Sequence, residues 1–241
     1  MADSFIFKAL LKEKAELFHV KLDDVALERF DIYGKLLVEW NEKINLTAIT
    51  DPEGVTIKHF LDSLTIFSCV DIPDGAKIID VGTGAGFPGL AMLIARPDLD
   101  MTLMDSTKKR LMVIENILEN IGLTANVVHS RAEEAGQNKI FREQYDFSTA
   151  RAVTNLRDLS EYCMPFVKVG GSFIPMKSAK AQEEISEAKK AIHALGGQIA
   201  KVDSFDLLDC GERIIINIKK ISSTPAKYPR PSAKIAKNPI R

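Results

Sequence analysis

Apolar residues near the start of the chain recur every three or four positions, which is the spacing of a buried helix face. Residues 5 to about 70 are therefore expected to be helical, with Asp23 or Asp24 as an N-cap. The apolar residues expected on one helix face are Leu27, Phe30, Tyr33, Leu37, Trp40 and Ile44. The sequence Asp-Pro-Glu-Gly at residues 51–54 predicts a turn before a second helical run through residues 59–64.

From Lys77 onward the pattern changes to short apolar runs that alternate with helical stretches. The expected strands lie at residues 77–81, 101–104, 126–129, 145–149, 171–176, 199–205 and 213–218. The expected helices are one starting near Pro88, one capped by Ser106 and ended by Gly122, and two at residues 156–167 and 181–195. This alternation predicts an α/β fold with a mostly parallel sheet covered on both faces. The last two strands are expected to form an antiparallel hairpin at one edge.

The chain has 241 residues, of which 46% are hydrophobic, and its formal net charge is -1. We expect a helical region at 1–72, a sheet domain at 73–221 and a tail at 222–241. No stretch approaches the ~18 apolar residues of a membrane helix, and no export signal is visible, so no membrane partner is expected. The three scattered cysteines fit neither a disulfide framework nor a metal site, and they favour a reduced, cytoplasmic compartment.

The tail is strongly basic, because no acidic residue follows Glu212. Lysine and arginine neutralise phosphate charge, so the tail is a candidate for RNA binding, with Tyr228 as a possible stacking surface. A solvated, disordered tail is the alternative. Its four prolines argue against a regular helix. The RNA-binding candidates are Lys177, Lys227, Tyr228, Arg230, Lys234 and Lys237.

A glycine cluster at residues 82–89 follows the first expected strand, as in turns that hold nucleotide-like cofactors. Two templates overlap there: the G-x-G-x-x-G pattern of dinucleotide sites and the acidic-x-G-x-G-x-G pattern of S-adenosylmethionine (SAM) methyltransferases. Asp80 favours SAM, because a carboxylate repels a pyrophosphate and attracts the ammonium end of SAM. Pro88 also removes an N–H that a pyrophosphate would use.

Three further positions at the carboxyl edge of the sheet fit a cofactor. Asp105 ends the second strand, where an acid binds ribose hydroxyls; a helix-capping role is the alternative. Ala132 and Glu133 follow the third strand, where adenine would lie. Arg151 ends the fourth strand, where substrate and cofactor should meet, and a structural ion pair is its alternative role. His59, Asp62 and Ser63, expected on one helix face, either cover the cofactor mouth or pack locally.

These motifs together resemble the bacterial small-subunit rRNA methyltransferase G family, also known as glucose-inhibited division protein B. The resemblance rests on residues 80–89, Arg-Ala-Glu at 131–133, Ala-Arg-Ala-Val at 150–153 and Tyr-Pro-Arg at 228–230, and on upstream motifs at 45–47 and 59–63. Ala233 and Ile235 stand where the family tail has Gly and Pro, which puts the tail geometry in doubt. Lys237 and Pro239 are retained.

The resemblance implies a Rossmann-like SAM-dependent enzyme that methylates N7 of one guanine in 16S rRNA, acting on the RNA or on a 30S particle. It implies SAM contacts at Gly82, Phe87, Ala132, Glu133 and Arg151. With the residues argued above, the expected cofactor-binding set is Gly82, Gly84, Gly86, Phe87, Asp105, Ala132, Glu133 and Arg151.

The expected chemistry is positioning catalysis with Arg151 as the positioning candidate, because guanine N7 carries a lone pair and no proton. The sequence shows no obvious pair of nucleophile and base, which agrees. A small-molecule SAM methyltransferase and a non-catalytic SAM-binding ribosome-associated module stay open as alternatives, and a monomer is expected.

Overall fold

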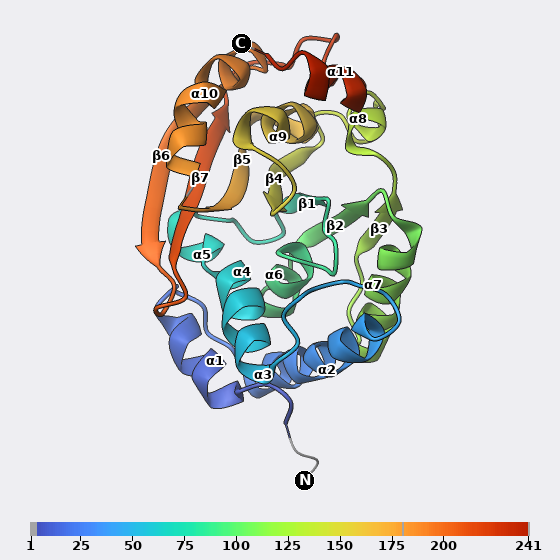
Figure 1. The fold of residues 1–241 in the computed structure, drawn as a ribbon, viewed down its shortest axis with the longest axis vertical. Coiled ribbons are helices and arrows are strands. Elements are labelled where there is room, and N and C mark those ends of the chain that lie inside the picture. The colour runs from blue at the N-terminus through green and yellow to red at the C-terminus, as the bar shows by residue number, and fades with distance from the viewer. Residues whose placement is uncertain (1–3, 180, 241) are drawn as a thin grey trace.

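The computed structural model describes residues 4–179 and 181–240 and is built around one seven-stranded sheet (Figure 1). The strands are β1 (Lys77–Val81), β2 (Asp100–Asp105), β3 (Asn126–His129), β4 (Tyr145–Arg151), β5 (Val167–Ser178), β6 (Gly197–Asp206) and β7 (Glu212–Lys220). Their order is β3-β2-β1-β4-β5-β7-β6, and β7 pairs antiparallel with both of its neighbours. The predicted parallel sheet with an antiparallel edge is therefore confirmed.

Helices cover both faces of this sheet, which Figure 1 shows nearly edge-on. The lower face in that view carries α1 (Lys8–Glu16), α2 (Asp24–Asn41), α3 (Pro52–Gly54), the π-helix η1 (Val55–Leu61), α4 (Asp62–Leu64), α5 (Ile66–Cys69), α6 (Gly89–Ala95) and α7 (Lys108–Ile121). The upper face carries α8 (Ala132–Ala135), α9 (Leu156–Cys163), the 3-10 turn η2 (Met164–Phe166), α10 (Ala181–Ala194) and α11 (Ser232–Lys237). No helix in these ranges is long and apolar enough to cross a bilayer.

Several predicted element ends are confirmed and several are wrong. Asp23 caps α2 by accepting a hydrogen bond from the N–H of Ala26, and Gly122 ends α7 with a φ of 64°. Ser106 does not cap α7; the residue before the helix is Thr107, whose N–H is bound by the carboxylate of Asp105 at 2.7 Å.

Prolines explain the remaining differences in the helices. The helix expected at 156–167 ends at Cys163, since Pro165 lacks the N–H that would continue it. The turn expected at 51–54 is instead the start of a helix, with Pro52 at its first position. The tail contains the helix α11, contrary to prediction, because Pro231 and Pro239 lie on either side of it.

The N-terminal helices share one hydrophobic cluster with the sheet and with α6 and α7. The contact with the glycine loop is aromatic: the ring of Tyr33 stacks on Phe87 with centroids 5.3 Å apart. The hydroxyl of Tyr33 also donates a 2.6 Å hydrogen bond to the carbonyl of Ala85. The helical region therefore helps to fix the conformation of the loop. The predicted division at residues 72 and 221 stays a prediction.

Gly86 is where this packing is tightest, because a Cβ added there would lie 2.5 Å from the hydroxyl of Tyr33, at a φ of 108°. We expect Gly86→Ala to lower the free energy of unfolding by about 2–4 kcal/mol through strain and overpacking. Gly122→Ala is the control, since that site also has positive φ but nothing within 4 Å; it should cost about 1 kcal/mol. Urea unfolding measures both, and equal losses would contradict the packing argument.

Candidate functional site

The glycine loop after β1 packs against the carboxyl end of β2. The N–H groups of Gly82 and Thr83 both donate to the carbonyl of Met104, at 2.8 and 2.9 Å. Gly82 and Gly84 have φ angles of 73° and 61°, which suit glycine. A Cβ at Gly84 would meet only one atom, 4.0 Å away, so the backbone here is open to a ligand.

The side chain of Asp80 fixes the glycine loop from the interior of the protein. Its side chain is fully buried, and Oδ2 accepts hydrogen bonds from the Thr83 hydroxyl at 2.7 Å and the Gly89 N–H at 2.8 Å. Oδ1 has no partner among the described residues. Burial raises the pKa of Asp80 to about 6. Asp80 therefore shapes the turn from within the core.

A cleft of about 290 Å³ lies beside the loop; we call it the cofactor cleft. Its lining residues are Val81, Gly82, Met104, Asp105, Ser106, Ser130, Arg131, Ala132, Glu133, Val153, Thr154, Tyr162 and Ser232. The predicted residues Gly82, Asp105, Ala132 and Glu133 thus come together from three strand ends. The other predicted residues, Gly84, Gly86, Phe87 and Arg151, do not line this cleft. Gly86 and Phe87 are buried against Tyr33.

The donor set of the cofactor cleft fits SAM. Each oxygen of the Asp105 carboxylate accepts one backbone hydrogen bond, from Gly84 at 3.0 Å and from Thr107 at 2.7 Å. A carboxylate offers about four lone-pair positions, so capacity for ribose hydroxyls remains. Met104, Val153 and Tyr162 supply apolar surface for a purine ring. Asp105 therefore ties the loop and faces the cleft.

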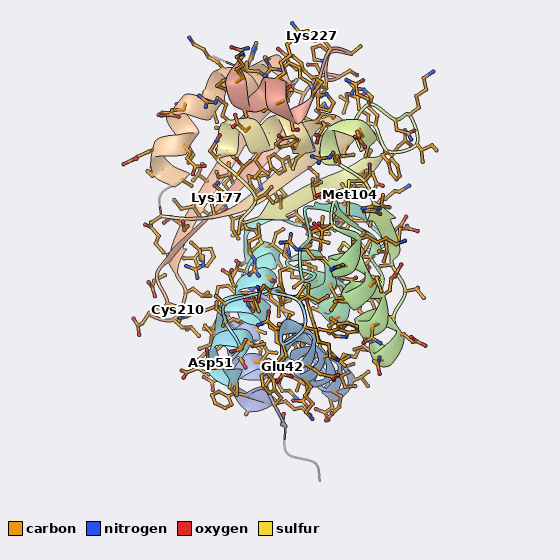
Figure 2. The ribbon with its side chains drawn as sticks, turned by 45° about the vertical axis from the view of Figure 1, so that its right-hand side comes forward. Glu42, Asp51, Met104, Lys177, Cys210 and Lys227 are labelled. Carbon is orange, nitrogen blue, oxygen red and sulfur yellow. The ribbon has the colours of Figure 1, made fainter. Side chains whose placement is uncertain are left out.

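A second cleft of about 370 Å³ lies on the other side of the end of β4; we call it the acceptor cleft. It is lined by Lys58, His59, Asp62, Arg151, Ala152, Met176, Lys177, Ser178, Glu184, Arg213 and Ile215. Figure 2 labels Lys177 from the acceptor cleft and Met104 from the cofactor cleft, both in the middle part of the molecule. Consecutive residues join the clefts, since Ala152 lines one and Val153 the other.

Arg151 lies in an ion-pair network in the acceptor cleft. Its Nη1 is 2.7 Å from Oδ2 of Asp62, and the Nε of Arg213 is 2.8 Å from Oδ1 of the same carboxylate. The Arg151 guanidinium also lies 4.9 Å from the centre of the Phe87 ring. The structural ion pair considered from sequence is therefore present, at the place where the two clefts meet. Ala152 next to it has a φ of 57°, a strained conformation typical of functional sites.

His59 forms the wall behind Arg151. Its ring stacks on Phe87 with centroids 4.5 Å apart, and Nε2 is 2.8 Å from the hydroxyl of Thr47. Burial, together with the charge of Arg151, lowers the pKa of His59 to about 3. The imidazole is therefore neutral near pH 7. Ser63, expected on the same face, is fully buried and donates to the carbonyl of His59.

The structure changes the picture of the RNA-binding candidates. Tyr228 is only 8% exposed, so it does not offer the predicted stacking surface. Arg230 is paired with the buried carboxylate of Glu161 through Nε at 2.7 Å and Nη2 at 2.6 Å. Lys177 is 2.8 Å from a carboxylate oxygen of Glu184. Three of the candidate side chains are exposed: Lys227, Lys234 and Lys237.

Several lining residues could not be found from sequence. Tyr162 and Ser232 enter the cofactor cleft from α9 and from the start of α11. Arg213 and Glu184 enter the acceptor cleft from β7 and α10. None of these residues belongs to a motif, and only the topology of the sheet brings them to the site.

Comparison with solved structures supports the fold. The chain aligns with a SAM-dependent O-methyltransferase from Thermotoga maritima at a TM-score of 0.55 and 16% identity, covering 78% of this chain and 73% of that one. It also aligns with a 16S rRNA (adenine(1408)-N(1))-methyltransferase mutant from Catenulisporales acidiphilia, with a TM-score of 0.53, 14% identity, and coverage of 63% and 88%. The fold defines the class: a Rossmann-like α/β fold of the kind found in these two methyltransferases.

Sequence comparison gives the family. The family model for rRNA small subunit methyltransferase G (GidB) matches residues 26–210. Proteins named ribosomal RNA small subunit methyltransferase G are 48% identical in Acetivibrio thermocellus, over 97% of this chain and 96% of that protein, and 46% identical in Geobacillus sp. strain WCH70, over 99% and 100%. The chain belongs to the rRNA small subunit methyltransferase G family, and the resemblance read from its motifs is confirmed.

Asp105 provides a test of the cofactor cleft. We expect Asp105→Asn to weaken SAM binding roughly 10- to 100-fold, since the variant loses charged hydrogen bonds to the ribose. Titration calorimetry with SAM measures the dissociation constant. Asp100→Asn, at the exposed opposite end of β2, is the matched control and should bind normally. Unchanged affinity in the Asp105 variant would remove this residue from the cofactor site.

Proposed function

We propose that this enzyme methylates N7 of a guanine in 16S rRNA, with the base in the acceptor cleft. The observation that carries the proposal is a cationic cleft that adjoins the cofactor cleft. Its ionised side chains are four cations and two carboxylates: Lys58, Arg151, Lys177, Arg213, Asp62 and Glu184. Their excess positive charge suits an RNA acceptor.

The groups of the acceptor cleft agree with N7 as the nucleophile. N7 already presents its lone pair, so no proton has to be removed before methyl transfer. His59 has a pKa of about 3 and is a weak base, and both oxygens of Asp62 are engaged by arginines. An acceptor that must lose a proton, such as an exocyclic amine, favours a free general base. Glu184, the remaining carboxylate, is paired with Lys177 at 2.8 Å, so the groups of this cleft are consistent with N7 as the acceptor.

Catalysis then consists of alignment. SAM, when bound, would supply an electrophilic methyl group to a lone pair held in line with it. Asp105, Gly82, Ala132 and Glu133 would hold the cofactor at one side of the end of β4. Arg151, fixed by Asp62, borders the base on the other side. Holding the reactants in line lowers the activation barrier by restricting their motion before reaction.

The exposed lysines of the tail are proposed to bind RNA phosphates outside the clefts. Figure 2 shows Lys227 at the opposite end of the molecule from Glu42, the residue that directly follows α2. A groove beside the tail is lined by both Lys227 and Lys234, and it shares Arg131, Glu133 and Ser232 with the cofactor cleft. RNA lying in this groove would run directly past the cofactor. The proposed partner is the free RNA or the 30S particle. We propose further that the enzyme acts as a monomer and in the cytoplasm.

A label-transfer assay tests the proposed function. Tritiated SAM is incubated with the enzyme and either 16S rRNA or 30S particles, and the RNA is then treated with borohydride and aniline. Chain scission at the labelled base is expected, because this treatment cleaves at N7-methylguanosine. Label without scission would place the methyl group on another atom. Absence of label in both RNAs would favour a binding module or a small-molecule enzyme.

The proposed role of the tail lysines can be tested through the salt dependence of RNA binding. We expect the triple variant Lys227→Gln, Lys234→Gln and Lys237→Gln to weaken RNA binding and to reduce the slope of log affinity against log salt by about 2–3, since each phosphate contact contributes about 0.7–0.9. Filter binding between low and moderate salt measures the slope. The control is a second triple variant, Lys12→Gln, Lys21→Gln and Lys43→Gln, which changes the net charge equally at exposed sites in the N-terminal half. Equal slopes in the two triple variants would exclude a specific role of the tail.

A further inference from the structure

Two carboxylates line the acceptor cleft, and they are used differently. Asp62 has both oxygens engaged, one by Arg151 and one by Arg213. Both partners are charged arginine side chains, so this carboxylate is already neutralised within the protein. Its evident role is to hold the two arginines in place. Glu184 is the carboxylate with acceptor capacity remaining.

The carboxylate of Glu184 is bound to the other described residues through only one of its two oxygens, Oε2. Its Oε2 accepts hydrogen bonds from the N–H of Leu156 at 2.6 Å and lies 2.8 Å from the ammonium of Lys177. Lys177 is itself fixed by a 2.7 Å hydrogen bond to the carbonyl of Thr154. No hydrogen bond to Oε1 is found within residues 4–179 and 181–240, and the side chain is 26% exposed. The carboxylate is thus oriented in advance, with one oxygen available.

The groups that anchor Glu184 and Lys177 place this carboxylate near the cofactor cleft. Leu156 and Thr154, which anchor Glu184 and Lys177, belong to the segment after β4. Thr154 also lines the cofactor cleft. The available oxygen of Glu184 therefore belongs to the part of the acceptor cleft that adjoins the cofactor, where a reacting base must lie.

We propose that Glu184 is a specificity-determining residue that reads the Watson–Crick edge of the acceptor guanine through Oε1. This inference rests on the proposed function. An ionised carboxylate only accepts hydrogen bonds, and guanine offers N1–H and the 2-amino group as donors on that edge. Adenine has one donor on that edge, its 6-amino group, and presents at N1 a lone pair that repels a carboxylate. Because N7 lies on the opposite side of the purine, a base held in this way keeps N7 free for methylation.

The chemistry gives a reason for the selectivity. A site built to hydrogen-bond a substrate donor rejects an analogue without that donor, since its own polar group is then left unpaired. Adenine also carries an N7 lone pair, so N7 chemistry alone does not exclude it. Glu184 supplies the missing discrimination between the two purines.

The test compares 30S particles that carry either guanine or adenine at the acceptor position, using tritiated SAM. For the wild-type enzyme we expect kcat/KM to be at least a hundredfold higher with guanine. Glu184→Gln should lower this guanine-to-adenine ratio at least tenfold, because the amide is uncharged and can donate to adenine N1. Glu183→Gln, exposed in the same helical turn, is the matched control and should leave the ratio unchanged.

The outcomes separate the possibilities. A role limited to holding the N–H of Leu156 would reduce the rate on both particles alike, and an unchanged ratio would overturn the proposal. Should the Glu184 variant fail to bind SAM, the wild-type enzyme still decides: adenine particles methylated within tenfold of guanine particles would overturn it. If the wild-type enzyme labels no guanine particle, the proposed function itself fails.

Discussion

The buried carboxylate of Asp80 is the interaction on which the site depends. It lies at the end of β1 without exposure to solvent, and it binds a hydroxyl at the start of the glycine loop and the first N–H of α6. One side chain therefore sets both the turn and the direction of the following helix. Burial makes this carboxylate costly to ionise, and its two donors offset part of that cost. The cofactor cleft is the space left beside the turn so formed.

The end of β4 joins the two halves of the site. Arg151 is fixed by Asp62 from the N-terminal helices, and Asp62 is fixed in turn by Arg213 from the antiparallel strand β7. Residues from the first third, the middle and the last part of the chain thus meet at one carboxylate. Cofactor and acceptor clefts keep their relative position because consecutive residues of one segment line them: Arg151 and Ala152 line the acceptor cleft, and Val153 and Thr154 line the cofactor cleft. This rigidity is what alignment of two reactants requires.

The sequence predicted the strands because short segments rich in apolar residues lie between turn residues; β1 and β3 have the predicted ends. Asp105 and Ala132, which line the cofactor cleft, could be predicted because a ligand site in a parallel sheet lies just beyond the strand ends. Glu184 and Arg213 were not, since their role comes from tertiary contacts. Tyr228 was misjudged because composition shows the charge of the tail but not the buried Glu161 that draws Arg230 inward.

The ion pair between Arg230 and Glu161 makes the tail part of the folded structure. Glu161 is almost completely buried, and its charge is neutralised by Arg230. Ser232, two residues later, lines the cofactor cleft. Proteolytic removal of the segment from Arg230 onward would leave an uncompensated buried charge, which costs about 3–5 kcal/mol when a partner is removed, and would take one wall residue out of the cleft. A single cut in the tail would therefore weaken the core and open the cleft at the same time.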